Sequence, residues 1–592
     1  MNLSLQIQQI AAETLENLYQ ESFTVSDFQI NETKPEFEGN YTIVLFALVK
    51  RLKKSPDAIG QELGQTLIEK HPELFTGFNI IKGFLNLTIS DEYYKSILLR
   101  FNNDVCFGKH PMNGKKVMVE YSSPNTNKPL HLGHLRNNFL GWSVAEILKA
   151  NGYEVYKSCI VNDRGIHICK SMVAWQLFAN GATPESTNTK GDHFVGDYYV
   201  KFNDAYKKEI AEGIAAGLSE AEAEKNAPIM KLTQQMLVDW EAGKPEVMDL
   251  WKKMNAWVYE GFDVTYASIG SDFDKIYYES NTYLLGKDTV QKGLEKGIFY
   301  KKDDGSVWID LQPDGLDEKL LLRKDGTSVY ITQDIGLAMQ KYEEYKIDKS
   351  IYVIGDEQNY HMKVLQLIAQ KLGLPYGNDI HHLSYGMVEL PSGKMKSREG
   401  TVVDADDLVD EMRNTAKQHT ESLGKVKDFN PEELNQLYST IGLGAMKFYL
   451  LRVDPKKKMI FNPEESIDFH GFTGPFIQYS YARIKSILRR EEPISTPSSF
   501  SSPLLPLEKK LLFELEQYPQ ILSTAGNALD PSVLANFLFQ LAKSFNAFYA
   551  EHSISNAENE EKKQLRLALI GMIANVIQSG MQLLGIRVPE RM

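Results

Sequence analysis

The hydrophobic pattern of the chain changes several times, and each change predicts a different kind of structure. Up to about residue 110, short helical and strand patterns alternate and end in the apolar stretch 78–90, FNIIKGFLNLTIS, which predicts a strand pair. From residue 116, a strand pattern (117–121), helical spacing (139–152) and a second strand pattern (154–163) follow one another. This order predicts a β-α-β unit in a parallel sheet, which binds ligands beyond the carboxyl ends of its strands.

The rest of the chain is dominated by helical patterns. Residues 180–290 are rich in Ala, Glu and Lys and predict a helical insertion, before the α/β pattern resumes at 350–355. After about residue 425 the pattern is almost purely helical. We therefore expect a multidomain α/β plus all-α protein: an N-terminal α+β domain (1–112), a parallel-sheet domain with the insertion (113–425) and a C-terminal helical bundle (426–592).

Composition is that of an ordinary globular protein. With 592 residues, 43% of them hydrophobic and 24% charged, the chain is too long for one core and is neither collagen-like nor largely disordered. No apolar run is long enough for a membrane span, and the amphipathic start lacks the basic region of a signal peptide. The 3 cysteines predict neither a disulfide framework nor a zinc site, so we expect a cytoplasmic protein without a structural metal.

The net charge of −13 argues against a nucleic-acid partner, because phosphate binding requires basic surface. The distribution of charge weakens that argument. Residues 421–592 hold 19 Lys and Arg against 19 Asp and Glu, with basic runs at 456–458 and 483–490. The whole excess of acid therefore lies before residue 421, and a nucleic-acid partner on the C-terminal side stays compatible with the sequence.

A histidine pair is the first candidate for chemistry. His131 and His134 flank Gly133 at the start of a predicted helix, after a strand and the loop PNTNKP. Gly133 would let a nucleotide approach the backbone, while the helix N-terminus and the imidazoles would stabilise charge on its α-phosphate. Two histidines at a helix start are the structural alternative, and the strand–loop–helix context favours the functional interpretation.

The second candidate is the loop GKMKSREG at 393–400. Its three cations are Lys394, Lys396 and Arg398. A glycine-flanked loop with three cations suits a clamp on a pyrophosphate leaving group, although alone it would be interpreted as a solvated basic loop.

These two motifs, in this order, resemble the paired signatures of class I aminoacyl-tRNA synthetases. The stretches 119–141, 330–361 and 472–484 are similar to blocks of the arginyl-tRNA synthetase family. The second signature departs from the usual pattern, with a lysine at its third place and a serine in place of its second lysine. Which cation holds the pyrophosphate therefore stays open, with Lys394 preferred over Lys396 and Arg398.

The resemblance implies a Rossmann-like catalytic domain, an N-terminal domain that contacts the tRNA D-loop and a helical anticodon-binding domain. It implies ATP-dependent activation of L-arginine to arginyl-adenylate and transfer to the 3′ end of tRNA(Arg), with release of AMP and pyrophosphate. We expect Mg²⁺ as the counter-ion of ATP and not in a protein metal site, because the sequence contains no clustered ligand motif. By the same resemblance we expect a monomer.

The resemblance also implies an arginine site. Its members are Glu120, Asn125, Tyr330, Asp334 and Gln358. Tyr330 and Asp334 share one face if their segment is helical and would bind the arginine side chain, with Asn125 and Gln358 completing the pocket. Glu120 would be available to the α-amino group. Asp163 and His361 are weaker candidates, since a turn aspartate and a helix-start histidine explain them equally well.

Two aromatic groups are candidates for contact with tRNA. On the C-terminal side, Phe476, Tyr479 and Arg483 recur at helical spacing and suit stacking on unpaired bases and contact with phosphate. An aromatic packing stripe is the alternative. On the N-terminal side, Phe84 and Asn86 resemble the family's contact to the D-loop, with a strand residue and its exposed neighbour as the alternative.

Two other functions stay open. A nucleotidyltransferase outside translation also uses such a histidine motif on an α/β core, but it would not need a large helical C-terminal domain. A catalytically inactive tRNA-binding relative is disfavoured by the intact His131, Gly133, His134 and Asp334.

Overall fold

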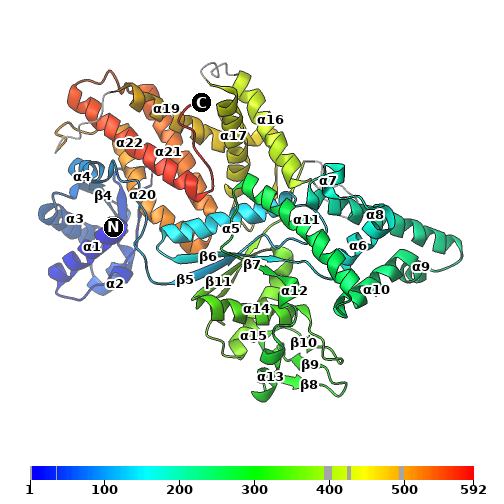
Figure 1. The fold of residues 1–592 in the computed structure, drawn as a ribbon. Helices are drawn as coiled ribbons and strands as arrows, with labels where there is room; N and C mark the ends of the chain where they lie inside the picture. The colour runs from blue at the N-terminus through cyan, green and yellow to red at the C-terminus, as the bar shows by residue number, and fades with distance from the viewer. Residues whose placement is uncertain (1–2, 35, 392–402, 423–428, 492–498) are drawn as a thin grey trace.

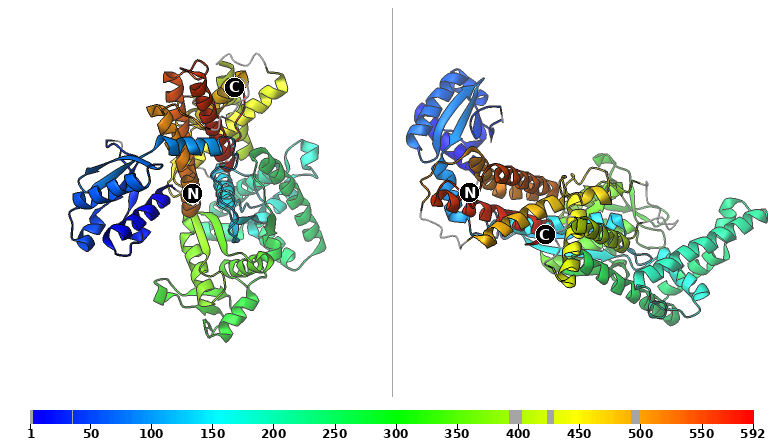
Figure 2. Two further views of the ribbon diagram at one scale, coloured as in Figure 1. Left: turned by 90° about the vertical axis from the view of Figure 1, so that its left-hand side faces the viewer. Right: turned by 90° about the horizontal axis from the view of Figure 1, so that it is seen from above.

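The computed structural model describes residues 3–34, 36–391, 403–422, 429–491 and 499–592. The N-terminal region lies beside the C-terminal helices, and the helices inserted into the sheet domain project at the opposite end of the molecule (Figures 1 and 2). The central sheet lies between these two ends. No helix in these ranges combines the length and the apolar character needed to cross a membrane.

The N-terminal region is an antiparallel sheet covered by helices. Its strands are β1 (Ile30–Glu32), β2 (Tyr41–Val44), β3 (Phe75–Ile81) and β4 (Phe84–Ile89), in the order β1-β2-β4-β3. The helices are α1 (Leu3–Tyr19), α2 (Phe46–Leu52), α3 (Pro56–Lys70) and α4 (Asp91–Phe101). The predicted strand pair is confirmed as β3 and β4, joined by Lys82 and Gly83 at φ of 51° and 80°. A glycine at the second position avoids the steric cost of that left-handed backbone.

The central sheet is parallel, as the pattern predicted. Its order is β12 (Ile380–Tyr385), β11 (Lys349–Gly355), β5 (Lys116–Glu120), β6 (Glu154–Val161) and β7 (Lys275–Tyr278). Helix α5 (Leu132–Ala150) follows β5, and α15 (Asn359–Lys371) follows β11. The chain runs outward from β5 to β6 and β7 and then returns on the other side to β11 and β12. Ligands bind at such a reversal, beyond the carboxyl ends of β5 and β11.

Two insertions interrupt the sheet. Between β6 and β7 lie α6 (Ile166–Phe178), α7 (Pro184–Thr187), α8 (Gly191–Ala215), α9 (Glu220–Asn226), α10 (Pro228–Glu241) and α11 (Pro245–Ile269). The helical stretch thus ends earlier than the expected residue 290, because β7 returns to the main sheet. Between β7 and β11 a small antiparallel sheet was not anticipated: β8 (Phe299–Lys301), β9 (Val307–Ile309) and β10 (Lys319–Leu322), with helices α12 (Glu279–Thr282), α13 (Lys287–Glu295) and α14 (Tyr330–Tyr345).

The C-terminal region is helical. Its helices are α16 (Ala405–Ser422), α17 (Pro431–Leu451), α18 (Pro463–Ser466), α19 (Gly474–Arg490), α20 (Pro506–Ala528), α21 (Pro531–Glu551) and α22 (Glu560–Leu583). A short parallel pair of β13 (Val388–Glu389) and β14 (Met459–Ile460) joins it to the sheet domain.

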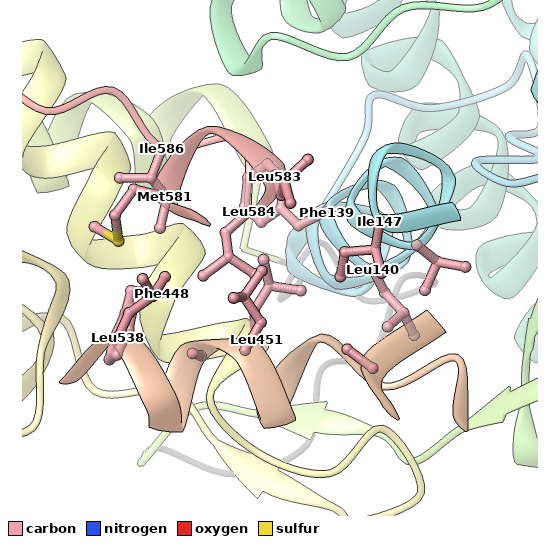
Figure 3. Packing of buried hydrophobic residues seen from close by; sticks show 14 of the residues in the cluster. Phe139, Leu140, Ile147, Phe448, Leu451, Leu538, Met581, Leu583, Leu584 and Ile586 are labelled. Carbon is pink, nitrogen blue, oxygen red and sulfur yellow. The ribbon is translucent and has the colours of Figure 1, made fainter. Parts of the chain in front are cut away.

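The helical region and the sheet domain share one apolar core. Phe139, Leu140 and Ile147 of α5 lie beside Phe448 and Leu451 of α17 (Figure 3). The cluster is completed by Met581, Leu583, Leu584 and Ile586. Burying such side chains is the dominant favourable term in folding, so this joint core fixes the helices relative to the central sheet. On its far side, α20 contacts the N-terminal sheet, where the Tyr41 hydroxyl donates to Glu516 at 2.8 Å.

Candidate active site

The histidine motif lies between β5 and α5, at the point where the strand order of the central sheet reverses. Between β5 and α5 the backbone passes through left-handed conformations at Ser122 (φ 82°) and Ser123 (φ 47°). Asn137 of α5 holds this turn, because its Oδ1 accepts from the Ser122 N–H at 2.6 Å and its Nδ2 donates to the Val353 carbonyl of β11 at 2.7 Å. The start of α5 is therefore tied to both β5 and β11.

The two histidines cap the helix that they begin. The Gly133 N–H donates to Nδ1 of His131 at 3.1 Å, and the His131 N–H donates to Nδ1 of His134 at 3.1 Å. A nitrogen that accepts an N–H carries no proton, so in each neutral ring the proton lies on Nε2. Both imidazoles thereby become N–H donors on Nε2, with their ring centres 3.9 Å apart.

Burial keeps these rings neutral. It lowers the pKa of His131 to about 3, assisted by the charge of Lys128, and it lowers the pKa of His134 well below its ordinary value. Burial also lowers the pKa of Lys128 itself. The site therefore offers two neutral donors, a helix N-terminus and one nearby ammonium group, a set that suits an oligophosphate. Lys128 was not singled out from sequence, where it is one lysine in a polar loop.

Helix α5 also holds the residues on both sides of the second signature. On the N-terminal side, the buried Arg136 donates to the Gly386 carbonyl at 2.6 Å. On the C-terminal side, Leu132 N–H donates to the Val403 carbonyl at 3.2 Å, and Ala405 N–H donates back to the Leu130 carbonyl at 3.0 Å. The predicted cations lie outside the described residues: Lys394, Lys396 and Arg398.

The predicted guanidinium residues lie on α14 and near the start of α15. Tyr330 and Asp334 occupy the first turns of α14, so the assumption of helix is confirmed, and the Tyr330 ring is 74% exposed. His361 Nε2 lies 2.6 Å from Asp334 Oδ2, and this contact raises the pKa of His361. Gln358 is exposed just before α15, and Asn125 is exposed in a bridge to Asn162.

Two predicted carboxylates already have protein partners. Glu120 is buried at the end of β5 and accepts from the buried ammonium of Lys341. Asp163 accepts from Ser280 N–H at 2.8 Å, Ser280 Oγ at 2.7 Å and the Tyr259 hydroxyl at 2.9 Å. Asp163 thus fixes the loop after β6, which agrees with the turn-aspartate interpretation.

Glu279 is an acidic group that sequence reasoning missed. It directly follows β7, and burial together with the charges of Asp163 and Asp334 raises its pKa to about 7, against the opposing effect of Arg164. Glu279 and Asp334 therefore feel each other's charge at the same edge of the sheet. No local signal in ESNTYLLG indicates this, because only the return of β7 to the sheet places Glu279 there.

Among the described residues, Asp192, His193 and Asp406 come close enough together to suggest a cation site. The ammonium group of Lys190 already lies between the two carboxylates, 3.2 Å from Asp192 and also paired with Asp406. Lys190 therefore supplies the positive charge that pairs with these carboxylates, and the cluster joins α8 to the start of α16.

The two residues of the predicted N-terminal tRNA contact differ in exposure. Phe84 is 38% exposed and lies edge-on to Phe46, which is 53% exposed, with ring centres 5.5 Å apart. Asn86 is only 1% exposed. It accepts from Thr42 Oγ1 and donates to Asn79 Oδ1, so it holds neighbouring strands together and cannot reach a ligand from this position. The exposed partner is Phe46, which sequence reasoning did not identify.

The C-terminal prediction places three residues on one half-buried face of α19. Phe476 packs against Phe539 with ring centres 5.1 Å apart, so its ring belongs in part to the bundle core. Arg483 lies 4.9 Å from the Tyr479 ring and 5.3 Å from the Tyr549 ring, and it donates to Asn546. Tyr549, 42% exposed, extends this surface from α21.

Comparisons with known proteins agree with this architecture. The family models described as "tRNA synthetases class I (R), catalytic domain", "DALR anticodon binding domain" and "Arginyl tRNA synthetase N terminal domain" match residues 96–462, 477–592 and 5–89. The chain is 51% identical to an arginine–tRNA ligase of Flavobacterium psychrophilum over 96% of each chain, and 53% identical to that of Bacteroides thetaiotaomicron over 98% of each. The solved arginyl-tRNA synthetase of Thermus thermophilus superposes with a TM-score of 0.82 at 25% identity over 100% of both chains. The chain belongs to the class I arginyl-tRNA synthetase family.

Proposed function

We propose that the chain is an arginine–tRNA ligase that charges tRNA(Arg) in two steps. The arginine carboxylate attacks the α-phosphate of ATP, forming arginyl-adenylate and releasing pyrophosphate, and a ribose hydroxyl at the tRNA 3′ end then attacks the adenylate carbonyl and releases AMP. The observation that carries this proposal is that a site suited to an anionic group and a site suited to a cationic group lie at the same edge of the central sheet. The start of α5 suits phosphates, and the acidic groups of α14 and the end of β7 suit a guanidinium group.

At the phosphate end, catalysis is electrostatic. The Nε2–H groups of His131 and His134 are preorganised donors, and the dipole at the N-terminus of α5 also favours the charge that develops on the α-phosphate. Gly133 keeps this approach open. Lys128 and the 393–400 loop, with Lys394, Lys396 and Arg398, supply positive charge for the pyrophosphate, and Mg²⁺ accompanies ATP as its counter-ion.

At the guanidinium end, the carboxylate of Asp334 is the charged acceptor for the arginine side chain, and Glu279 adds negative charge beside it. Tyr330, exposed on the same face of α14 one turn earlier, offers an apolar face to the aliphatic stem. Gln358 and Asn125 add amide groups at the rim. The Lys341–Glu120 ion pair leaves one Glu120 oxygen as acceptor for the α-amino group.

The tRNA contacts in the proposal are the exposed Phe84–Phe46 pair and the α19 face of Phe476, Tyr479 and Arg483. In this proposal the three domains span 1–112, 113–425 and 426–592. The enzyme acts as a monomer in the cytoplasm. By resemblance to the family, adenylate formation requires bound tRNA. Tyr479→Ala should then raise the tRNA KM about five- to hundredfold in arginine-dependent pyrophosphate exchange, because one stacking contact is lost. Robust exchange without any tRNA would contradict this coupling and leave the synthetase function intact.

The experiment that tests the function is ATP–pyrophosphate exchange with each protein amino acid, with and without total tRNA. Only L-arginine should support exchange, and only radiolabelled arginine should be transferred to tRNA. Exchange with a different amino acid would overturn the substrate assignment. If no amino acid supports exchange or transfer, the chain is not an active synthetase.

A further inference from the structure

A buried ion pair joins helix α14 to the central sheet at the edge where ligands bind. The side chain of Lys341, on α14, is 0% exposed, and that of Glu120, the last residue of β5, is 6% exposed. The ammonium group of Lys341 donates to Oε2 of Glu120. The same ammonium lies 4.5 Å from the ring centre of Tyr352 on β11 and 5.8 Å from that of Tyr277 on β7. Lys341 therefore packs among residues of three strands.

Stability alone does not account for this pair. Taking an ammonium and a carboxylate out of water is costly, and apolar side chains of similar volume in their place are often at least as stable. Burial alone lowers the pKa of Lys341, but the charge of Glu120 outweighs burial, and the pKa is raised. Lys341 thus stays an ammonium group in a place where a packed apolar side chain would suffice for the fold. A role for one of the two charges explains the pair better than packing does.

Glu120 lies where its charge can serve a substrate. It ends β5, and the chain then passes through the turn at Ser122 to His131 at the start of α5. Ligands bind beyond the carboxyl ends of the strands at such a reversal of strand order. Lys341 donates to Oε2, and an ionised carboxylate has a second oxygen that can accept from another donor. This arrangement suits a primary ammonium group of the substrate.

Helix α14 carries groups for both ends of an arginine molecule. Asp334 lies near its start and Lys341 lies seven residues later on the same face, a rise of about 10 Å along the helix. Asp334 is the carboxylate proposed for the guanidinium group, and Lys341 fixes the carboxylate proposed for the α-amino group. One rigid helix can therefore set the separation between the two carboxylates that the two ends of the substrate require.

We infer that Lys341 is a positioning residue for the α-amino group of arginine: it holds the Glu120 carboxylate ionised and oriented so that the second oxygen accepts from that group. Lys341 itself does not touch the substrate and acts only through Glu120. This inference rests on the proposed function and extends its arginine site. It implies that the enzyme selects for an α-amino group and that this selection depends on Lys341.

The test compares arginine with deaminoarginine, which has a hydrogen in place of the α-amino group. The KM of arginine and the competitive KI of deaminoarginine are measured by arginine-dependent pyrophosphate exchange at saturating tRNA. In the wild-type enzyme the KI should exceed the KM about ten- to hundredfold, because one charge-assisted hydrogen bond is missing. We call this ratio the amino preference.

Lys341→Met should reduce the amino preference. The arginine KM should rise about tenfold while the deaminoarginine KI changes less than about twofold, because only the α-amino contact depends on Glu120. A merely structural role would weaken both ligands alike. An equal change in both constants would therefore overturn the inference, as would wild-type values of both.

A second pair of variants keeps the test valid if Lys341→Met does not fold, since that variant leaves Glu120 buried without a partner. Glu120→Gln should abolish the amino preference. Adding Lys341→Met to Glu120→Gln should change the preference no further, because the two residues act as one unit. A preference that survives Glu120→Gln, or one that the second substitution changes again, would overturn the inference.

The matched control is a buried ion pair elsewhere in the chain. Lys562 of α22 pairs with Glu508 of α20 in the C-terminal helices, with side chains 7% and 0% exposed. Lys562→Met should lower the melting temperature, as loss of one partner of a buried pair does, and leave the amino preference unchanged. A loss of preference in this control would show that the ratio responds to stability alone, and the inference would fall.

These failures differ from failure of the proposed function. If the unmodified enzyme charges tRNA with arginine and the variants keep the wild-type amino preference, only the role of Lys341 is refuted. If the unmodified enzyme neither exchanges pyrophosphate with arginine nor charges tRNA, the function on which the inference rests is refuted.

Discussion

The two ends of the active site use histidine in opposite ways. At the phosphate end, His131 and His134 are half-buried next to Lys128, and their pKa values fall far below the ordinary range. At the guanidinium end, His361 is partly exposed and contacts Asp334, and its pKa is raised. An anionic substrate group is served by neutral N–H donors at a helix start, whereas a cationic group needs a carboxylate, whose charge also favours the protonated form of a neighbouring histidine. The environment, more than the residue type, determines the role.

The largest effect is expected at the phosphate end. His131→Asn should lower kcat for arginine activation about a hundredfold, because one preorganised donor to the transition state is lost. Asparagine is also a favourable N-cap, so the melting temperature should stay close to that of the wild type. Pyrophosphate exchange and thermal unfolding measure the two quantities.

His419→Asn is the matched control, since His419 lies on α16 beside Glu464 and far from the start of α5. It should leave exchange unchanged. An active His131→Asn enzyme, or one that loses activity only through unfolding, would contradict the electrostatic role of the imidazole.

The next effect belongs to the guanidinium end. Asp334→Asn keeps the size of the side chain and removes its charge, so the arginine KM should rise about ten- to hundredfold with a smaller change in kcat. Asp249→Asn, on the exposed face of α11, is the control for loss of one carboxylate. Unchanged arginine kinetics would remove Asp334 from the pocket.

A third pair of variants tests which lysine of the second signature, at 393–400, contacts the pyrophosphate. If Lys396 replaces the displaced lysine, Lys396→Ala should lower kcat about tenfold with little effect on the arginine KM, because it would contact only the leaving pyrophosphate. Lys394→Ala is the parallel variant. If Lys394→Ala alone is slow and Lys396→Ala behaves as wild type, the clamp belongs to Lys394.

The smallest expected effect is on the pH dependence of the arginine KM. It gives the sharpest contrast between the guanidinium end and the phosphate end of the site. Because the contact with Asp334 raises the pKa of His361, its imidazolium forms as the pH is lowered and competes with the guanidinium for Asp334. Glu279, with a pKa of about 7, loses its negative charge over the same interval. The arginine KM should therefore rise about three- to tenfold between pH 8 and pH 6.

Variants separate these two contributions. His361→Gln should reduce the pH dependence of the arginine KM, and adding Glu279→Gln should flatten it. His131 and His134 stay neutral over this interval, so they should contribute no pH dependence to kcat. A KM independent of pH in the wild type would refute the competition at Asp334.

Much of the fold could be read from local patterns. The strand pair at 75–89, the β5–α5–β6 unit and the helical C-terminal region all follow from periodicity and turn residues, which act over short distances along the chain. Sequence reasoning missed β8 to β10, because strands of three or four residues give too little alternation to detect, and it placed the end of the insertion too late.

The properties of the site likewise divide into those set by the local sequence and those set by the tertiary structure. The sequence determined that His131, Gly133 and His134 begin a helix after a strand, since their geometry is built by neighbouring residues and their own capping bonds. Only the tertiary structure decided that the imidazoles are neutral, that Asn86 is buried between strands, and that Glu279 and His361 join Asp334. Burial and charge proximity depend on segments far apart in the chain, and these two factors set the pKa values and the accessibility of each side chain.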